Sequence, residues 1–363
     1  MEAVEVNTFT YDASSGEVAA VVPNIGDWTW CKIGLDENSF KVVKELLVYQ
    51  TDILTKNLGY KALLDLSMDK GKHKYEPLAN NSLLINFIHH EVDERTIRNL
   101  YDYAIYTAQN LIPSGNPKKG SNYPYYRFGN MKKIYYIMFD EMKKPRNHSE
   151  GIKAWLYKSA IDVCFWHLCV DIGFKAVHKG QELYKVADIE YEWIGLVQMY
   201  LDDYKLKVGL DTYTENLIKK DKSDLKTKYL AQIEVARADE TQRDKLFDEY
   251  FNPNTKMSVT AMRSSMQTFN HALVEFEDRK KHHRRFWNQI VDYLKITPYS
   301  RALAVFEDLL PRNCDDKEML NEFEKLSKRF GELNVDNRKF MNEKYAILKR
   351  NYKVKEYVES TLN

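Results

Sequence analysis

Apolar residues recur every three or four positions along much of the chain, the spacing that places them on one face of an α-helix. Glycine and proline are sparse, 14 and 9 of 363 residues, which favours long uninterrupted helices. Gly59 is expected to end the first helix, and Pro113 follows the predicted end of the second. The clearest apolar stripes of the first half lie within residues 40–54, 97–111, 155–167 and 194–201.

The C-terminal third carries a heptad pattern. Ser258 is expected to cap a helix whose apolar positions alternate at spacings of four and three, in one phase across residues 262–294. Lys280 and His283 occupy two of these positions, so the predicted seam contains a polar gap. Because a buried, unpaired lysine is strongly unfavourable, the helix should either break near Asp278 or present the gap to an anionic ligand.

Other segments complete the predicted organisation. Two β-prone runs, 4–11 and 17–22, flank a turn-forming sequence and predict a hairpin, which either closes its own lobe or exchanges with another subunit. Residues 212–251 are rich in alternating charges and indicate a solvated helical connector. Amphipathic segments around 319–330 and 340–352 predict an antiparallel helical pair.

The predicted fold class is therefore mainly α, a two-lobed helical protein with a short N-terminal β-hairpin arm. We expect the arm at residues 1–30, an N-terminal helical lobe at 31–205, a helical connector at 206–255 and a C-terminal helical lobe at 256–363.

Composition and local sequence favour a cytoplasmic protein. Residues 1–22 contain no basic residue and do not resemble a secretory signal. The apolar-rich stretch 160–170 is far shorter than the roughly 20 residues that a membrane span needs, so we expect no membrane partner. The four cysteines are scattered and fit reduced thiols better than a disulfide scaffold, which indicates a reducing compartment.

Charge is distributed unevenly along the chain. The first basic segment, residues 118–146, holds eight basic and two acidic residues, and the second basic segment, residues 279–301, holds seven and one. Each therefore carries +6, and because the whole chain carries only +1, the remainder carries −11. Partners respond to local potential rather than to net charge, so both segments predict contacts with an anionic macromolecule.

Both basic segments also contain many aromatic residues. Single-stranded nucleic acid needs this combination, because cations replace condensed counterions and rings stack on unpaired bases. The alternative interpretation is that the cations solvate helix faces while the rings fill the core. The residues predicted to bind nucleic acid are Lys118, Lys119, Tyr125, Tyr126, Arg127, Lys132, Lys133, Arg146, Arg279, Lys280, Lys281, Arg284, Arg285, Trp287 and Arg301.

Signals of catalysis are weaker. His282 and His283 lie within a basic run and could act as acid or base on a phosphodiester, with neighbouring arginines stabilising the developing charge. No acidic metal-binding cluster accompanies them. The chain contains no phosphate-binding glycine loop, dinucleotide fingerprint or nucleophile elbow, and Glu94 stands where a zinc-protease helix would place its second histidine. We therefore expect no metal, no cofactor and no catalytic residue.

One short motif lies inside the second basic segment. Thr297-Pro298-Tyr299-Ser300 resembles the Ser-Pro-Tyr-Ser found in the nucleoproteins of rhabdoviruses. The resemblance covers four residues and departs at the first of them, so it does not assign the chain to that family.

The two basic segments favour a non-enzymatic, self-associating protein that binds single-stranded nucleic acid, RNA in preference to DNA, as a viral nucleocapsid protein does. One alternative is a nucleic-acid or phosphoester-processing enzyme that uses His282 or His283. Another is a helical scaffold whose seams bind protein partners.

Overall fold

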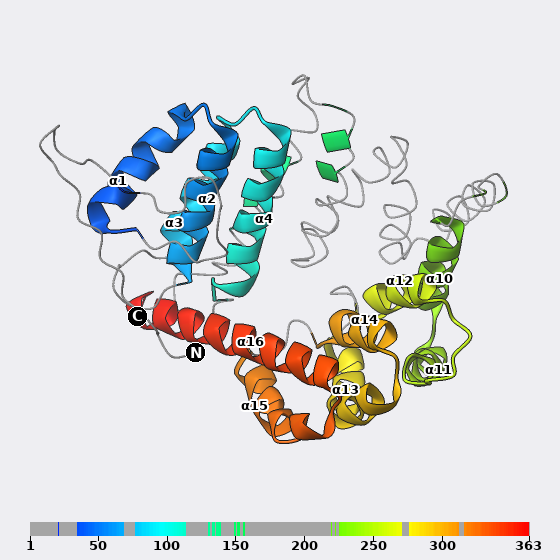
Figure 1. The fold of residues 1–363 in the computed structure, drawn as a ribbon. Coiled ribbons are helices and arrows are strands. Elements are labelled where there is room, and N and C mark those ends of the chain that lie inside the picture. The colour runs from blue at the N-terminus through cyan, green and yellow to red at the C-terminus, as the bar shows by residue number, and fades with distance from the viewer. Residues whose placement is uncertain are drawn as a thin grey trace, which may run out of the picture. The chain divides into compact units, whose positions relative to one another are not determined.

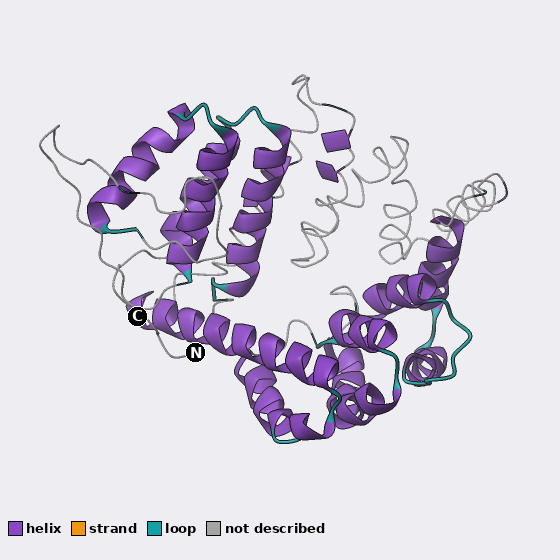
Figure 2. Cartoon of the chain, viewed as in Figure 1, coloured by secondary structure: helices purple, strands orange, loops and turns teal. Residues whose placement is uncertain are grey.

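A computed structural model describes residues 21, 35–68, 77–113, 130, 133–134, 136–138, 149, 151–152, 155–156, 219, 222, 225–270, 276–311 and 316–362. Within these ranges the chain is mainly helical and forms no strand (Figures 1 and 2). The prediction of a mainly α protein is therefore confirmed. The predicted β-hairpin lies outside the described residues, apart from Val21, which has no regular structure.

The chain divides into two compact units, Met1–Thr107 and Ala108–Asn363. The boundary falls near the end of α4 (Glu94–Asn110). The lobes predicted at 31–205 and 256–363 stay a prediction, because residues 157–218 lie outside the described part.

Three helices of the N-terminal unit begin directly after an aspartate. Asp36, Asp52 and Asp93 each accept the backbone N–H of the residue three positions later, at 2.7–3.0 Å. Each carboxylate thereby satisfies one of the N–H groups that a first helical turn leaves unpaired. The elements before α4 are α1 (Glu37–Leu46), the 3-10 helix η2 (Leu47–Tyr49), α2 (Ile53–Ser67) and α3 (Pro77–Ile88).

Gly59 does not end a helix, contrary to the prediction. It lies within α2, where an added Cβ would approach the side chain of Leu47 to 2.5 Å. The absence of a side chain therefore lets Leu47 pack directly against the α2 backbone. A glycine used for close approach and one used for helix termination look alike in sequence, so the apolar spacing could not distinguish them.

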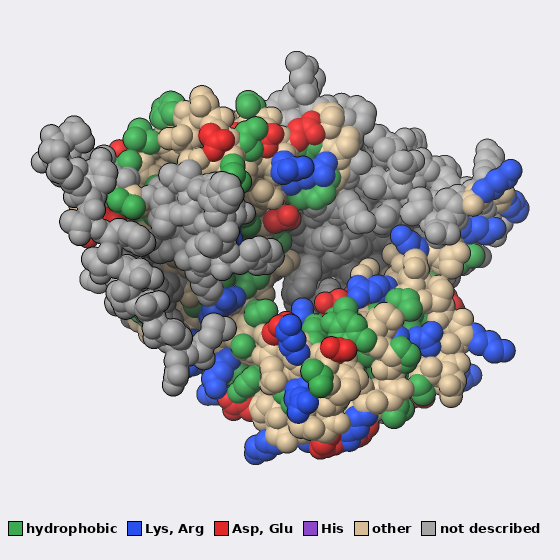
Figure 3. All heavy atoms as spheres, in the orientation of Figure 1, with side chains coloured by type: hydrophobic (Ala, Val, Ile, Leu, Met, Phe, Trp, Pro, Cys, Tyr) green, Lys and Arg blue, Asp and Glu red, His purple; other side chains and the backbone are tan. Residues whose placement is uncertain are grey.

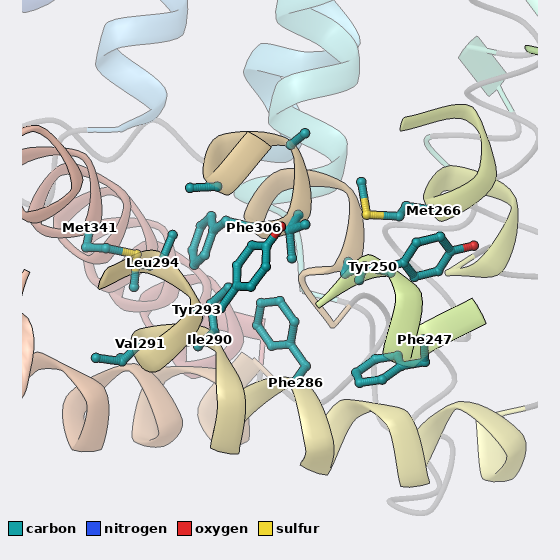
Figure 4. Packing of buried hydrophobic residues seen from close by; sticks show 14 of the residues in the cluster. Phe247, Tyr250, Met266, Phe286, Ile290, Val291, Tyr293, Leu294, Phe306 and Met341 are labelled. Atoms are coloured by element: carbon teal, nitrogen blue, oxygen red, sulfur yellow. The ribbon is translucent and has the colours of Figure 1, made fainter. Parts of the chain in front are cut away.

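The C-terminal unit is built around an aromatic core. Phe306 lies at its centre, with ring centroids 5.2 Å from Phe340, 5.8 Å from Phe323 and 6.2 Å from Phe286 (Figure 4). Neighbouring helices include α10 with α12, α12 with α14, α13 with α14 and α15, and α15 with α16, the pair predicted at the C-terminal end. The elements are α10 (Leu225–Arg237), α11 (Glu240–Tyr250), α12 (Val259–Phe269), α13 (Phe276–Ile296), α14 (Tyr299–Leu309), α15 (Asp316–Ser327), the 3-10 helix η4 (Phe330–Glu332) and α16 (Val335–Leu362).

Helices α10 and α11 fall in the stretch that was predicted to be a solvated connector. In the structure Val235, Phe247 and Tyr250 are buried in the core of the C-terminal unit. The hydroxyl of Tyr250 also shares a 2.5 Å hydrogen bond with Ser265 of α12. The described part of this stretch therefore packs as an integral part of the unit.

The heptad seam predicted across residues 262–294 is interrupted. Helix α12 ends at Phe269, and the side chain of Asn270 donates to two backbone oxygens at the end of α14, at 3.1 and 2.8 Å. Helix α13 runs through Asp278, and its predicted seam residues Ile290 and Leu294 are buried. The helix therefore does not break near Asp278. Lys280 is exposed and reaches water, whereas His282, which the heptad did not place in the seam, is buried. The alternative, that the polar gap faces an anionic ligand, stays a prediction.

Candidate nucleic-acid interface

The described residues cover the second basic segment far better than the first. Lys133 is exposed on a helical turn, and Arg279 lies in α13 with a side chain outside the described part. The interface can therefore be built from α13 and its neighbours. The predicted site residues that lie wholly outside the described ranges are Lys118, Lys119, Tyr125, Tyr126, Arg127, Lys132 and Arg146.

The core fixes the orientation of α13. Phe286, Ile290 and Leu294 recur every four residues and are buried (Figure 4). The opposite side of the N-terminal half therefore faces water. The basic helix face, as we name it, consists of the exposed side chains of Lys280, Lys281 and Arg284.

Acidic residues of α11 lie against α13. The carboxylate of Asp244 is shared by three side chains of α13: Lys281 Nζ lies 2.6 Å from one oxygen, and His282 Nε2 and Arg285 Nη1 lie 2.9 and 3.3 Å from the other. One turn of α13 thus directs three nitrogen-bearing groups at one carboxylate. This arrangement ties the two helices together.

Glu240 and Asp248 extend the acidic side of this contact. Lys281 also lies 3.4 Å from Glu240, and Arg285 also pairs with Asp248. Glu240, Asp244 and Asp248 are spaced by four residues and share one face of α11, which we call the acidic stripe. Two predicted phosphate-binding cations, Lys281 and Arg285, are therefore already paired within the chain.

The contact shifts the protonation equilibria of its members. The hydrogen bond from Lys281 is the largest cause that lowers the pKa of Asp244, with a further contribution from His282. The same hydrogen bond, in which Asp244 is the acceptor, raises the pKa of Lys281. Both groups therefore stay charged throughout the neutral range.

His282 is enclosed by aromatic rings. Its side chain is only 4% exposed, and its ring centroid lies 5.1 Å from Phe247 and 4.9 Å from Phe269. The guanidinium of Arg285 lies over the ring of Phe247, 4.6 Å from its centroid. Such packing leaves little room for a phosphodiester at His282. The proposed acid–base role of this residue thus receives no support from the geometry.

Arg301 and Trp287 of the second basic segment make contacts within the C-terminal unit. Arg301 donates to the backbone oxygens of Pro253, Thr255 and Met257 at 3.2–3.4 Å, which holds the segment between α11 and α12. Trp287 is partly buried, with its ring 5.5 Å from the centroid of Phe323 on α15. Their contacts to nucleic acid stay a prediction.

Arg284 differs from its neighbours. It is exposed, and among the described residues it makes no recorded hydrogen bond, ion pair or ring contact. Figure 3 shows basic and acidic side chains interspersed on the visible described surface of the C-terminal unit, rather than one continuous basic patch.

Sequence reasoning missed the acidic stripe. Its signal was present as three carboxylates at i, i+4 and i+8, opposite cations at two positions four residues apart. What the sequence lacked was the tertiary pairing, since the linked residues stand 37–41 positions apart. A charge count over the second basic segment therefore overstated the potential that α13 presents to solvent.

Comparison with known protein families and with curated proteins finds no match to this chain. Among the described residues, no group of histidine, cysteine or acidic side chains is arranged to hold a metal ion. No described helix combines the length and apolar character needed to cross a membrane.

Proposed function

We propose that the protein is a non-enzymatic, self-associating protein that binds single-stranded nucleic acid, RNA in preference to DNA, as nucleocapsid proteins do. The observation that carries the proposal is the basic helix face of α13, where Lys280, Lys281 and Arg284 are exposed on a helix whose other side is fixed in a core. The first basic segment supports it through sequence alone.

The geometry of α13 suits contacts with a phosphate backbone. Lys280 and Arg284 are four residues apart and lie one above the other, with Lys281 beside them. Burial of Phe286 and Ile290 holds the backbone beneath these side chains, so binding need not order the helix first. Phosphate contacts of this kind are independent of base sequence and depend strongly on salt.

A titration of a fluorescently labelled 20-nucleotide oligouridine tests the proposal. The logarithm of the affinity should fall linearly with the logarithm of salt concentration, with a slope of about −0.7 per phosphate contact. Arg284→Glu should weaken binding roughly tenfold and reduce the steepness of that slope by about 0.7 or more. An oligouridine affinity that is absent, or that does not change with salt, would contradict the proposal.

Lys339→Glu supplies the matched control. Lys339 is also an exposed cation without a recorded partner among the described residues, but it lies on α16. Its reversal changes net charge equally and should alter affinity much less than Arg284→Glu. Equal losses in the two variants would show that binding follows net charge and not the basic helix face. Melting temperatures of both variants should match that of the wild type.

Self-association is tested separately, through the predicted hairpin. Deletion of residues 1–22 should reduce the oligomer size measured by sedimentation while circular dichroism reports nearly unchanged helical content. If the shortened chain unfolds instead, the hairpin belongs to the core of its own subunit and the exchange hypothesis is wrong.

A further inference from the structure

The three carboxylates of the acidic stripe differ in their exposure to water. Asp244 pairs with the enclosed His282, and the side chain of Asp244 is 31% exposed. Glu240 and Asp248 lie at the ends of the stripe, with side chains 83% and 67% exposed. The central carboxylate is therefore built into the packing of the unit, whereas water surrounds the two outer ones.

We propose that α11 is an internal competitor for nucleic acid, in which Glu240 and Asp248 occupy Lys281 and Arg285 until phosphates displace them. The proposal rests on the proposed function and adds a regulatory element to the same site. Carboxylate and phosphate oxygens satisfy the same lysine and guanidinium donors, so each can replace the other. Carboxylates spaced by one helical turn present such oxygens to α13 at regular intervals.

The local energetics allow this exchange. An exposed ion pair contributes little, because water solvates both partners once they separate. Lys281 and Arg285 can therefore exchange Glu240 and Asp248 for a ligand while they remain beside Asp244, which together with His282 keeps the two helices in contact. On this basis α11 lowers the affinity of α13 for any polyanion without blocking it.

The double variant Glu240→Gln plus Asp248→Asn tests the proposal on the full chain. Removing both outer carboxylates should tighten oligouridine binding by about 2- to 20-fold, since each exposed pair accounts for a factor of up to about five. The slope of the logarithm of affinity against the logarithm of salt concentration should become more negative by about 1.4, as expected for two additional phosphate contacts.

A control variant separates this effect from a change in net charge. Glu343→Gln plus Glu356→Gln on α16 removes two exposed carboxylates that make no recorded contact among the described residues. It should leave affinity and salt dependence close to those of the wild type. Equal tightening in both double variants would overturn the proposal, because only net charge would then matter.

A mutant cycle with Lys281→Gln makes the test specific to the residue. In the wild-type background this substitution should weaken oligouridine binding only slightly, because Asp244 and Glu240 together already pair with the lysine. In the Glu240→Gln plus Asp248→Asn background the same substitution should weaken binding several-fold more. Additive effects would overturn the proposal, and unchanged melting temperatures would show that the variants are folded.

The outcomes distinguish the inference from the function on which it rests. Wild-type binding that the double variant leaves unchanged would refute the competitor role and leave nucleic-acid binding intact. Oligouridine binding by neither protein would refute both.

Discussion

Each compact unit contains a carboxylate shared by several polar side chains, and the two carboxylates differ in their access to water. In the N-terminal unit, Glu91 accepts hydrogen bonds from Lys56 Nζ and from the hydroxyl of Tyr60, each at 2.9 Å, and its side chain is 1% exposed. In the C-terminal unit, Asp244 binds Lys281, His282 and Arg285 on the half-exposed side of α11.

The difference separates a structural contact from an exchangeable one. Water cannot replace the partners of Glu91, so loss of any member leaves a buried polar group unsatisfied. Lys281 and Arg285 stay partly hydrated beside Asp244, so this contact contributes less to folding, and their pairs with the exposed Glu240 and Asp248 are the ones proposed to open to a ligand. Similar ion pairs thus serve different purposes because the solvent around them differs.

The largest expected effect comes from removing the buried carboxylate. Glu91→Ala should lower the free energy of unfolding by about 3–5 kcal/mol, because the largely enclosed Lys56 side chain loses its carboxylate partner and the Tyr60 hydroxyl loses its acceptor. Urea denaturation measures the loss, and hydrogen exchange should place it in α2 and α4.

Apolar replacement of the whole group provides the control. Lys56→Met, Tyr60→Phe and Glu91→Leu together should recover much of the stability that Glu91→Ala loses, since no buried polar group then remains unpaired. A triple variant as unstable as the single one would show that the loss arises from packing and not from electrostatics.

The second effect is smaller. Asp244→Asn should lower the free energy of unfolding by about 1–2 kcal/mol, because its cationic partners are partly hydrated and only His282 is enclosed. The lowered pKa of Asp244 fixes the pH dependence: its stabilisation is present above the ordinary aspartate pKa of about 3.9 and is lost as pH falls through the lowered folded value. The variant and wild type should therefore converge in strong acid, and a difference that persists there would contradict the ionic origin.

Much of this architecture is readable from sequence, because helices depend on local spacing. The pairing of α15 with α16 followed from two amphipathic segments with a short connection. The predicted cap at Ser258 is also present, with its hydroxyl accepting the N–H of Ala261 at 3.2 Å. Both features involve residues close together in the chain.

Features that depend on tertiary packing were missed or assigned wrongly. The heptad phase of α12 was extended across Asn270, where the helix ends, so the buried position of His282 was not predicted. The contacts of Asp244 and Glu91 were not predicted, because their partners lie 31 or more positions away in the chain. The sequence therefore identified the cations of α13, while the pairing that limits their charge was not predicted.

The third effect appears in alkali. Burial, together with the neighbouring Glu91, raises the pKa of Tyr60. A raised folded pKa gives stability that is complete below the unfolded tyrosine pKa of about 10 and is lost as pH rises beyond it. Tyr60→Phe should lose about 1 kcal/mol at neutral pH with the hydrogen bond, and this deficit should shrink above about pH 10. A deficit that is constant from pH 7 to pH 11 would show that the hydroxyl titrates alike in folded and unfolded chains.

The smallest effect distinguishes the two carboxylates by salt. The screening length falls from about 10 Å at 0.1 M salt to about 3 Å at 1 M, and screening acts mainly on charges that water reaches. The destabilisation caused by Asp244→Asn should therefore shrink by a few tenths of a kcal/mol or more between these conditions. That caused by Glu91→Ala should stay nearly constant, because its contacts are buried. Comparing each variant with the wild type at the same salt concentration cancels the general effect of salt on folding. If both deficits shrink equally, Glu91 is as accessible to ions as Asp244, and burial no longer explains why the two contacts would contribute so differently to folding.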